Sequence, residues 1–276
     1  MSLKLMYITN DPRIARMAEA NGVDRIFVDM EYIGKDLRQG GMDTVQSKHT
    51  VGDVKRISDV LSSSELLVRV NPIHEKTDLY PSSKEEIDAA IESGADILML
   101  PYFKTAAEVK EFIDLVGGRT KVMPLVETPE AAEAIDEIIA LDGIDEIFVG
   151  LNDLSLGYGM KFMFQLLADG TVDSLCEKFK ARGIPFGFGG LASLDKGLLP
   201  GKMVLKEHYR LGSSCVILSR IFCNSSKITD SEEIASIFSE GISSIREYER
   251  LCENETDFIE NKNAVAIAVE GIVKNL

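Results

Sequence analysis

Short, continuous apolar runs recur along the chain, separated by longer segments in which apolar residues return every three or four positions. Continuous runs are typical of strands buried on both faces, and the longer segments are typical of amphipathic helices. Glycines such as Gly94 and Gly183 stand just before a run, where they end the preceding helix. We expect eight strands: residues 3–8, 25–29, 65–70, 95–100, 121–127, 145–150, 184–188 and 215–219.

The intervening segments predict helices, most clearly at residues 105–116 and 129–141. In the second of these, Thr128 is the expected N-cap and Pro129 takes the first helical position. Eight strands that alternate with helices over this length predict a (β/α)8 TIM barrel. A doubly wound open sheet is the alternative, but residues 9–12 (TNDP) lack the glycine-rich turn that such a sheet usually carries after its first strand.

No break in composition divides the barrel, so residues 1–253 are expected to form one catalytic domain. The apolar tail at residues 254–276 predicts an extra C-terminal helix, packed on the barrel or on a neighbouring subunit. Two long loops, at residues 32–50 and 73–83, follow the second and third strands. In a barrel, loops on that side surround the active site.

Composition excludes several classes of protein. The chain has 276 residues, with 30 Lys and Arg against 45 Asp and Glu, a net charge of −15 that argues against binding nucleic acid. No apolar run reaches the ~18 residues of a membrane span, and the first residues do not resemble a signal peptide. Four cysteines without C-x-x-C spacing and three histidines provide no zinc cluster, so we expect a reduced, cytoplasmic location.

Charged side chains directly follow several apolar runs, namely Asp29, Arg69, Glu127 and Asp153. The carboxyl ends of barrel strands meet at one mouth, and neighbouring strands lie ~4.8 Å apart. Glu127 and Asp153, from the fifth and sixth strands, can therefore converge on one point. Two carboxylates, completed by water and substrate oxygens, suit Mg²⁺ or Mn²⁺.

Arg69 can bind a carboxylate through its planar guanidinium group. A hard cation and an arginine around one small site suit a 2-keto acid, because together they would stabilise the enolate formed when a carbon–carbon bond breaks. Spacing alone leaves other roles open: Asp153 could cap a loop, and Arg69 could form a structural ion pair with Glu31.

Four segments of the chain resemble the HpcH/HpaI aldolase and citrate lyase family. They are residues 25–31 (RIFVDME), 68–72 (VRVNP), 94–101 (GADILMLP) and 126–155, the last containing VET, IDEI, GIDEIFVG and DLS in order. The resemblance extends over residues 25–222. It implies a metal-dependent (β/α)8 barrel that makes or cleaves carbon–carbon bonds next to pyruvate-like or acyl groups.

The resemblance also implies roles for individual residues. Glu127 and Asp153 would bind the metal, and Arg69 would contact the substrate carboxylate and the enolate oxygen. The backbone of three successive residues would bind the substrate carboxylate: Gly150, Leu151 and Asn152. Members of the aldolase branch form homo-oligomers, so we expect a hexamer or trimer in which the last helix is exchanged between subunits.

The chain departs from the family pattern at three positions. Tyr32 stands where the aldolase branch has a histidine after Asp-x-Glu, and Leu125 stands where it has a glutamine. The Gly-Pro-x-Asp turn reads Gly150-Leu151-Asn152-Asp153. A phenol with an ordinary pKa of ~10 does not replace an imidazole that titrates near neutral pH.

The loop at residues 32–50 is a candidate source of the missing proton carrier. It contains several charged and polar side chains: Lys35, Asp36, Arg38, Gln39, Lys48 and His49. We expect the loop to cover the pocket and to bind an anionic group such as a phosphate or a sugar acid. His49 is the best candidate for the replacement base, and the alternative is a solvated loop whose charges face water.

These observations predict a class II, metal-dependent lyase that cleaves a 2-keto acid to pyruvate, or an analogue, and an aldehyde. Arg69 would stabilise the enolate, and Asp29, His49 or a metal-bound water would accept the hydroxyl proton. One alternative is an acyl-CoA lyase of the citrate lyase type, which would need a basic groove for the CoA phosphates. The other is a non-catalytic barrel used for binding or assembly, which Tyr32 and Leu125 favour.

Overall fold

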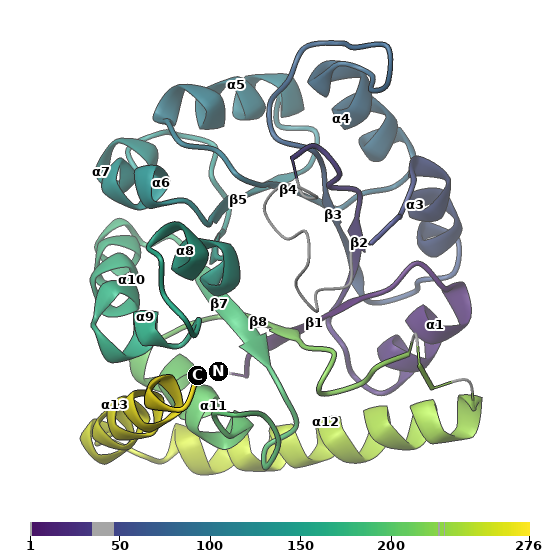
Figure 1. The fold of residues 1–276 in the computed structure, drawn as a ribbon. Coiled ribbons are helices and arrows are strands. Elements are labelled where there is room, and N and C mark those ends of the chain that lie inside the picture. Colours follow the sequence, from purple (N-terminus) through teal and green to yellow (C-terminus); the bar gives the residue numbers. More distant parts are fainter. Residues whose placement is uncertain (1, 35–46, 226, 229) are drawn as a thin grey trace.

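The computed structural model describes residues 2–34, 47–225, 227–228 and 230–276. Eight parallel strands form a closed barrel in chain order (Figure 1), and β8 pairs with β1, so the predicted (β/α)8 architecture is confirmed. The strands are β1 (Lys4–Ile8), β2 (Arg25–Asp29), β3 (Glu65–Arg69), β4 (Ile97–Leu100), β5 (Lys121–Val126), β6 (Ile147–Val149), β7 (Phe186–Leu191) and β8 (Cys215–Leu218).

Helices surround the barrel on all sides (Figure 1), and the last of them, α13, packs against α9 and α11. This confirms the extra C-terminal helix. The helices of the described residues are α1 (Pro12–Ala20), α3 (Val51–Ser58), α4 (Ser83–Glu92), α5 (Ala106–Val116), α6 (Pro129–Glu133), α7 (Ile135–Ile138), α8 (Leu151–Gly157), α9 (Gln165–Ala168), α10 (Thr171–Arg182), α11 (Gly201–Leu211), α12 (Ser231–Glu253) and α13 (Ile259–Lys274).

The helix predicted at residues 129–141 is broken in two. Its start is as expected, because the Thr128 hydroxyl accepts the backbone N–H of Ala131 at 3.1 Å and Pro129 follows it. The chain leaves the helical conformation at Ala134, which ends α6 and begins α7. The apolar periodicity continues across this break, so the pattern could not reveal it.

The seventh strand begins two residues later than predicted. Pro185 precedes it, and a proline has no N–H to donate to a strand ladder. The Pro185 carbonyl still accepts the N–H of Ile147 at 2.9 Å, so the chain enters the sheet there. The strand then continues through two glycines to Leu191, which the apolar pattern did not include.

Apolar side chains fill the inside of the barrel. They come from alternate positions of the strands, for example Met123 and Leu125 of β5, or Phe27 of β2 beside Leu67 of β3. Because alternation continues along each strand, the next inward position beyond this layer lies at the carboxyl end. Polar side chains at those positions therefore point into the mouth of the barrel.

Buried charges close the amino end of the barrel. Arg25 is completely buried and donates to both carboxylate oxygens of Glu146, at 2.8 and 2.5 Å, and to Glu65 at 2.8 Å. Such a group is stable in the interior only because it is paired. With this end closed and the lumen filled, the carboxyl mouth is the place for a ligand.

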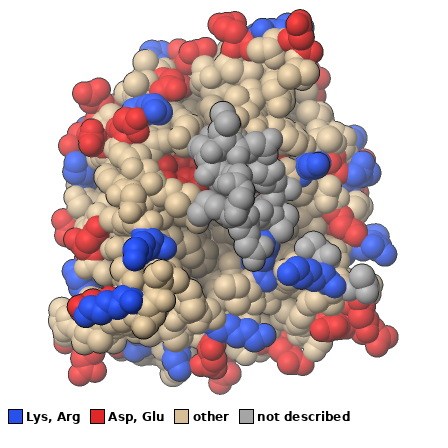
Figure 2. Space-filling view, viewed as in Figure 1, with Lys and Arg blue, Asp and Glu red and all other residues tan. Residues whose placement is uncertain are grey.

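Charged side chains of both signs lie on the surface of the described residues. On the face shown in Figure 2, Lys and Arg are scattered among Asp and Glu and form no continuous basic surface over the described residues. Among the described residues, every helix is too short or too polar to cross a bilayer.

Candidate active site

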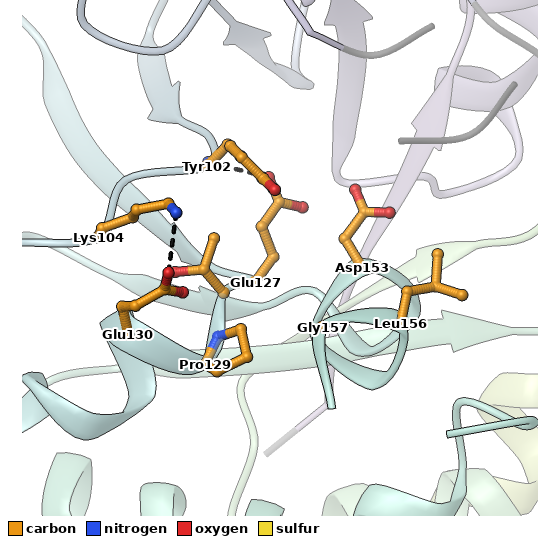
Figure 3. A pocket seen from close by; sticks show the side chains of 9 residues that line it. Tyr102, Lys104, Glu127, Pro129, Glu130, Asp153, Leu156 and Gly157 are labelled. Atoms are coloured by element: carbon orange, nitrogen blue, oxygen red, sulfur yellow. Dashed lines mark hydrogen bonds and ion pairs between the residues drawn. The ribbon is translucent and has the colours of Figure 1, made fainter. Parts of the chain in front are cut away.

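A cavity of about 510 Å³ opens at the carboxyl end of the barrel, beside the ends of β4, β5 and β6 (Figure 3). Carboxylates, an ammonium group and apolar side chains share its wall. The lining residues are Tyr102, Lys104, Glu127, Thr128, Pro129, Glu130, Asp153, Leu156 and Gly157.

Glu127 and Asp153 both open onto this cavity, and they lie on facing sides of it (Figure 3). Glu127 follows β5 and is 3% exposed, and Asp153 lies in the first turn of α8 and is 8% exposed. The structure therefore brings together the two acids that the sequence analysis assigned to a metal. Among the described residues, no third His, Cys, Asp or Glu joins them in a cluster able to hold a metal.

Two backbone features hold the Glu127 carboxylate. The N–H of Tyr102 donates to Glu127 Oε1 at 3.0 Å. Tyr102 has a φ of 49° and is the only non-glycine residue with a positive φ in the described part of the chain. A bulky residue adopts this conformation rarely, and such residues cluster at functional sites.

Gly150 packs directly against the side chain of Glu127. A Cβ atom on Gly150 would lie 2.9 Å from Glu127 Cβ and 3.0 Å from Glu127 Oε2, closer than side chains pack. The absence of a side chain at position 150 thus lets the Glu127 carboxylate occupy its place. The motif singled out Gly150 as a substrate contact, but nothing in the sequence indicated Tyr102.

Arg69 lies among carboxylates at the strand ends. Its Nε and Nη2 donate to the two oxygens of Asp29 at 2.8 and 2.9 Å, a pairing that the register of β2 and β3 sets up directly. Its Nη1 lies 3.2 Å from Glu31 Oε2 and 4.0 Å from Glu127 Oε2. Burial would lower the pKa of Arg69, but the charges of Asp29, Glu31 and Glu127 raise it well above its usual value.

Asp29 is engaged as well. Its carboxylate accepts the two hydrogen bonds from Arg69, and Oδ1 also accepts the backbone N–H of Glu31 at 3.3 Å. Taking up a proton would weaken this charge-assisted pair. The ion pair between Arg69 and Glu31, which spacing had left open, is present beside it.

His49 lies next to Asp29 and is 8% exposed. Its Nδ1 accepts the backbone N–H of Asp29 at 3.0 Å. A ring nitrogen that accepts a hydrogen bond carries no proton, so the imidazole is neutral and its proton lies on Nε2. Protonating Nδ1 would break this bond, so His49 presents a hydrogen-bond donor rather than a free basic nitrogen.

Tyr32, at the position of the family's histidine, does not replace the imidazole. Its hydroxyl donates to the carbonyl oxygen of His49 at 2.5 Å, and burial together with the charges of Asp53 and Asp29 raises its pKa. The phenol therefore stays protonated and ties the two ends of the loop together. Of the other charged and polar residues singled out in this loop, Lys48 is described, and four lie outside the described residues: Lys35, Asp36, Arg38 and Gln39.

Asn71 is a buried connection that the sequence analysis missed. Its Oδ1 accepts the backbone N–H groups of Tyr32 at 2.8 Å and Ile33 at 2.9 Å. Its Nδ2 donates to Glu86 Oε1 of α4 at 2.9 Å. Asn71 thereby holds the backbone that follows Asp29 and Glu31. It lies two residues after Arg69, just beyond the end of β3, and this place directly after a strand is the signal that could have found it.

The residues predicted to bind the substrate carboxylate begin α8. The N–H of Gly150 donates to the carbonyl of Val126, at the end of β5, at 2.9 Å, so this N–H is already engaged. Leu151 and Asn152 follow in the first turn, which no side chain of the described residues caps. The first N–H groups of a helix have no partner within the helix. The Asn152 side chain donates to Asp153 Oδ1 at 3.2 Å.

Two curated relatives are hydroxypyruvate/pyruvate aldolases. One, from Roseovarius nubinhibens, is 26% identical over 161 residues, which cover 54% of this chain and 62% of the relative. The other, from Sagittula stellata, is 28% identical over 145 residues, which cover 41% of this chain and 56% of the relative. The match therefore spans less than two thirds of the length of either relative.

Solved structures share the fold over nearly the whole chain. An HpcH/HpaI aldolase from Desulfitobacterium hafniense has a TM-score of 0.61 at 18% identity, covering 89% of this chain and 93% of its own. The citrate synthase SbnG has a TM-score of 0.59 at 18% identity, covering 90% of this chain and 95% of its own. At these identities the likeness concerns the fold.

The model of one family matches residues 4–163, more than half of the chain. The matched part runs from β1 through the cavity residues on β5 and α8, and so includes both carboxylates and Arg69. The chain belongs to the HpcH/HpaI aldolase/citrate lyase family.

Proposed function

We propose that this protein is a class II, metal-dependent aldolase-type lyase. It cleaves a hydroxylated 2-keto acid into pyruvate, or a close analogue, and an aldehyde. The observation that carries the proposal is that two nearly buried carboxylates, Glu127 and Asp153, line the same cavity. The guanidinium group of Arg69 lies close to Glu127. The family and its hydroxypyruvate/pyruvate aldolase relatives support it.

The donor set suits Mg²⁺ or Mn²⁺. These ions take one or two protein carboxylates and fill their other positions with water and substrate oxygens, so two acids without a third protein ligand from the described residues are sufficient. Glu127 and Asp153 would hold the cation. When bound, it would polarise the keto oxygen and stabilise the charge that develops there.

Arg69 supplies a permanent positive charge next to the carboxylates. Asp29 and Glu31 hold its guanidinium in place, and Nη1 is directed toward the Glu127 side of the mouth. We assign to Nη1 the contact with the oxygen that becomes negative in the transition state, where a preorganised donor is most effective. The amides of Leu151 and Asn152 would bind the substrate carboxylate.

Proton handling is assigned to the Asp29–His49 region. Asp29 is held in its ion pair, and His49 is held neutral with its proton on Nε2. We therefore propose that Asp29 accepts the hydroxyl proton of the substrate and returns it to the enolate carbon, which transiently weakens its pair with Arg69. His49 would orient the hydroxyl group by donating a hydrogen bond to a substrate oxygen through Nε2.

The alternative acyl-CoA lyase would bind several phosphates. Within the lining of the cavity, Lys104 is the only basic side chain among the described residues, and it is already paired with Glu130. This observation favours the aldolase reaction.

A substrate screen tests the proposal. Pyruvate release would be measured from a series of 4-hydroxy-2-keto acids, with Mg²⁺, with Mn²⁺ and with a chelator. We expect release that depends on the cation and is lost in Glu127→Gln and Asp153→Asn. Cleavage that survives chelation, or turnover of acyl-CoA thioesters only, would contradict it.

Two further expectations stand as proposals. All four cysteines are free and buried, which supports a reducing, cytoplasmic location. We also propose a homo-oligomer, a hexamer or trimer, and static light scattering on the purified protein would measure its mass.

A further inference from the structure

The loop between β3 and α4 is closed by a histidine whose two ring nitrogens both face carbonyl oxygens. His74 Nδ1 lies 2.7 Å from the carbonyl oxygen of Pro72, and Nε2 lies 2.8 Å from that of Pro81. The backbone of His74 joins the two ends of the loop as well, because its N–H donates to Ser83 Oγ at 2.8 Å and its carbonyl accepts the N–H of Ser83 at 3.1 Å. We call His74, Pro72, Pro81 and Ser83 the His74 clasp.

The two carbonyl oxygens determine which form of the ring fits the clasp. A carbonyl oxygen only accepts hydrogen bonds, and a neutral imidazole has a single ring N–H. Both ring contacts are therefore hydrogen bonds only in the imidazolium form. In the neutral form, one ring lone pair would face a carbonyl oxygen. The hydroxyl of Ser83, whose Oγ lies 3.1 Å from Nδ1, offers that lone pair another partner, so the neutral ring keeps Pro81 and loses Pro72.

The surroundings of the clasp contain several other charged groups. The titratable side chains of the loop, of the first turn of α4 and of the segment after β2 are Glu75, Lys76, Asp78, Tyr80, Lys84, Glu85, Glu86, Glu31 and Tyr32. Lys76 and Glu85 pair with each other at 2.8 Å. Burial raises the pKa of Glu86, and the hydrogen bonds from Asn71 and the charge of His74 oppose this rise. Histidine is the side chain that ordinarily changes its charge between about pH 5 and pH 8, so we assign the pH response of this region to His74.

Glu86 connects the clasp to the mouth of the barrel. Its Oε1 accepts a hydrogen bond from Asn71 Nδ2 at 2.9 Å, and Asn71 Oδ1 accepts the backbone N–H of Tyr32 at 2.8 Å. The loop itself carries Tyr80. Burial and two neighbouring aspartates raise the pKa of the Tyr32 hydroxyl, and the charges of Tyr80 and Glu86 add to this rise, which places both residues near Tyr32. A change in the loop therefore acts on the wall of the mouth.

We propose that His74 is a pH-sensitive switch that controls the β3–α4 loop: the imidazolium form holds the loop closed beside Tyr32, and loss of one ring proton loosens it. The protonated ring makes both carbonyl contacts, whereas the neutral ring makes one of them. The stabilisation of the closed loop is therefore present at the acid end of the range between about pH 5 and pH 8, and it is lost as the pH rises.

Hydrogen exchange followed by mass spectrometry tests the switch in the unaltered protein. It needs no substrate, so its outcome does not depend on the proposed reaction. Exchange is measured over residues 75–83, where the N–H of Thr77 donates to the carbonyl of Tyr80 and that of Ser83 to His74. After correction for the intrinsic effect of pH, we expect exchange about tenfold or more faster at pH 8 than at pH 5, the scale of one charge-assisted hydrogen bond. Equal corrected rates over this range would overturn the proposal.

Three variants separate His74 from the other charges. His74→Gln has no ring proton to lose, so its loop should exchange rapidly at every pH. Glu86→Gln keeps an acceptor for Asn71 but removes the negative charge near the ring, so the loop should open at a lower pH. Lys76→Met is the matched control, because it breaks the exposed pair with Glu85 in the same loop and should leave the pH dependence intact. A pH dependence that survives in His74→Gln, or is lost equally in Lys76→Met, would overturn the proposal.

The protonation of the ring can be followed independently. The chain has three histidines, so the ring resonance of His74 in an NMR spectrum is identified as the one that is missing in His74→Gln. We expect this resonance to titrate at the same pH at which the loop opens. A ring that titrates without any change in loop exchange, or a loop that opens while the ring keeps its charge, would overturn the proposal.

Discussion

At the scale of single residues, the hydrogen bonds already formed within the site determine which atoms remain to contact a substrate. Arg69 directs two donors at Asp29, and the Asp29 backbone occupies Nδ1 of His49. The candidate base predicted from the sequence is therefore present beside the strand end, but its basic nitrogen is occupied. No sequence pattern could have predicted this, because it depends on how the end of the long loop packs against β2.

Two substitutions of His49 distinguish a hydrogen-bond donor from a base. Gln retains an N–H donor near the position of Nε2, whereas Ala removes it. If His49 acts as a hydrogen-bond donor, His49→Ala should lower kcat by about 10²-fold, the usual effect of losing one such donor. His49→Gln should stay within about tenfold of the unaltered enzyme. Steady-state kinetics of pyruvate release measures both, and equal losses would show that His49 is the base.

Gly150 offers a test of the support for Glu127. In Gly150→Ala, the new methyl group would force Glu127 to move, because its nearest neighbour is Glu127 Cβ at 2.9 Å. We expect Mn²⁺ affinity to fall about 10- to 100-fold, as when a metal ligand loses its support. Calorimetric titration with Mn²⁺ measures it.

Gly52→Ala is the matched control, since a Cβ atom there meets nothing closer than 3.6 Å. Gly52 lies within α3, so alanine should leave Mn²⁺ affinity unchanged and stabilise the fold by about 0.5–1 kcal/mol. If Gly150→Ala binds Mn²⁺ as tightly as Gly52→Ala does, the close contact has no influence on the site.

At the scale of elements, the sequence pattern predicted the positions of the site residues more accurately than it predicted the ends of the helices and strands. Asp29, Arg69 and Glu127 lie where inward-facing positions continue beyond the apolar lumen, as their places after apolar runs indicated. The boundaries were less accurate, because β4, β6 and β7 each begin two residues later than predicted, and the break at Ala134 interrupts a continuous apolar pattern. Tyr102 and Asn71 were missed because their contributions come from a backbone N–H and a side-chain amide outside the charged motifs.

The link between β3 and α4 can be tested by exchanging donors and acceptors. Burial raises the pKa of Glu86, and the hydrogen bonds from Asn71 offset part of the rise. Asn71→Asp would place two carboxylates in contact in the interior, which we expect to cost about 3 kcal/mol at neutral pH. Adding Glu86→Gln restores a donor opposite the introduced carboxylate and should recover most of the stability.

The stability of Asn71→Asp should depend on pH in a defined direction. Repulsion raises the folded-state pKa of the carboxyl pair above its unfolded value, so Asn71→Asp should regain stability as pH falls through that pKa. The double variant should show no such gain. Denaturant unfolding between about pH 5 and pH 8 would measure the difference, and a single variant that is equally destabilised at every pH would contradict the account.

At the scale of the whole molecule, the barrel separates a structural end from a chemical end. The amino end is closed by Arg25, Glu65 and Glu146, and the carboxyl end holds the cavity. Burial would raise the pKa of Glu65, but hydrogen bonds from Lys121 and Arg25 lower it to about 2. Since this value lies below the ordinary 4.5, Glu65 stabilises the fold above pH 4.5 and loses that contribution as pH falls toward 2.

Glu65→Gln should therefore be less stable than the unaltered protein at neutral pH, with the gap closing between about pH 4.5 and pH 2. Acid titration followed by circular dichroism would show the two curves converging. A gap that stays constant over this range would mean that the ion pairs of Glu65 do not stabilise the fold.

The measurement that tests the central claim most directly is a calorimetric titration of the protein with Mn²⁺, repeated on Glu127→Gln, Asp153→Asn and Glu130→Gln. We predict one site per chain in the unaltered protein, its loss in the first two variants, and its retention in the third. Mn²⁺ that binds equally well without Glu127 and Asp153, or does not bind at all, would contradict the metal-dependent lyase and favour a barrel that serves binding or assembly.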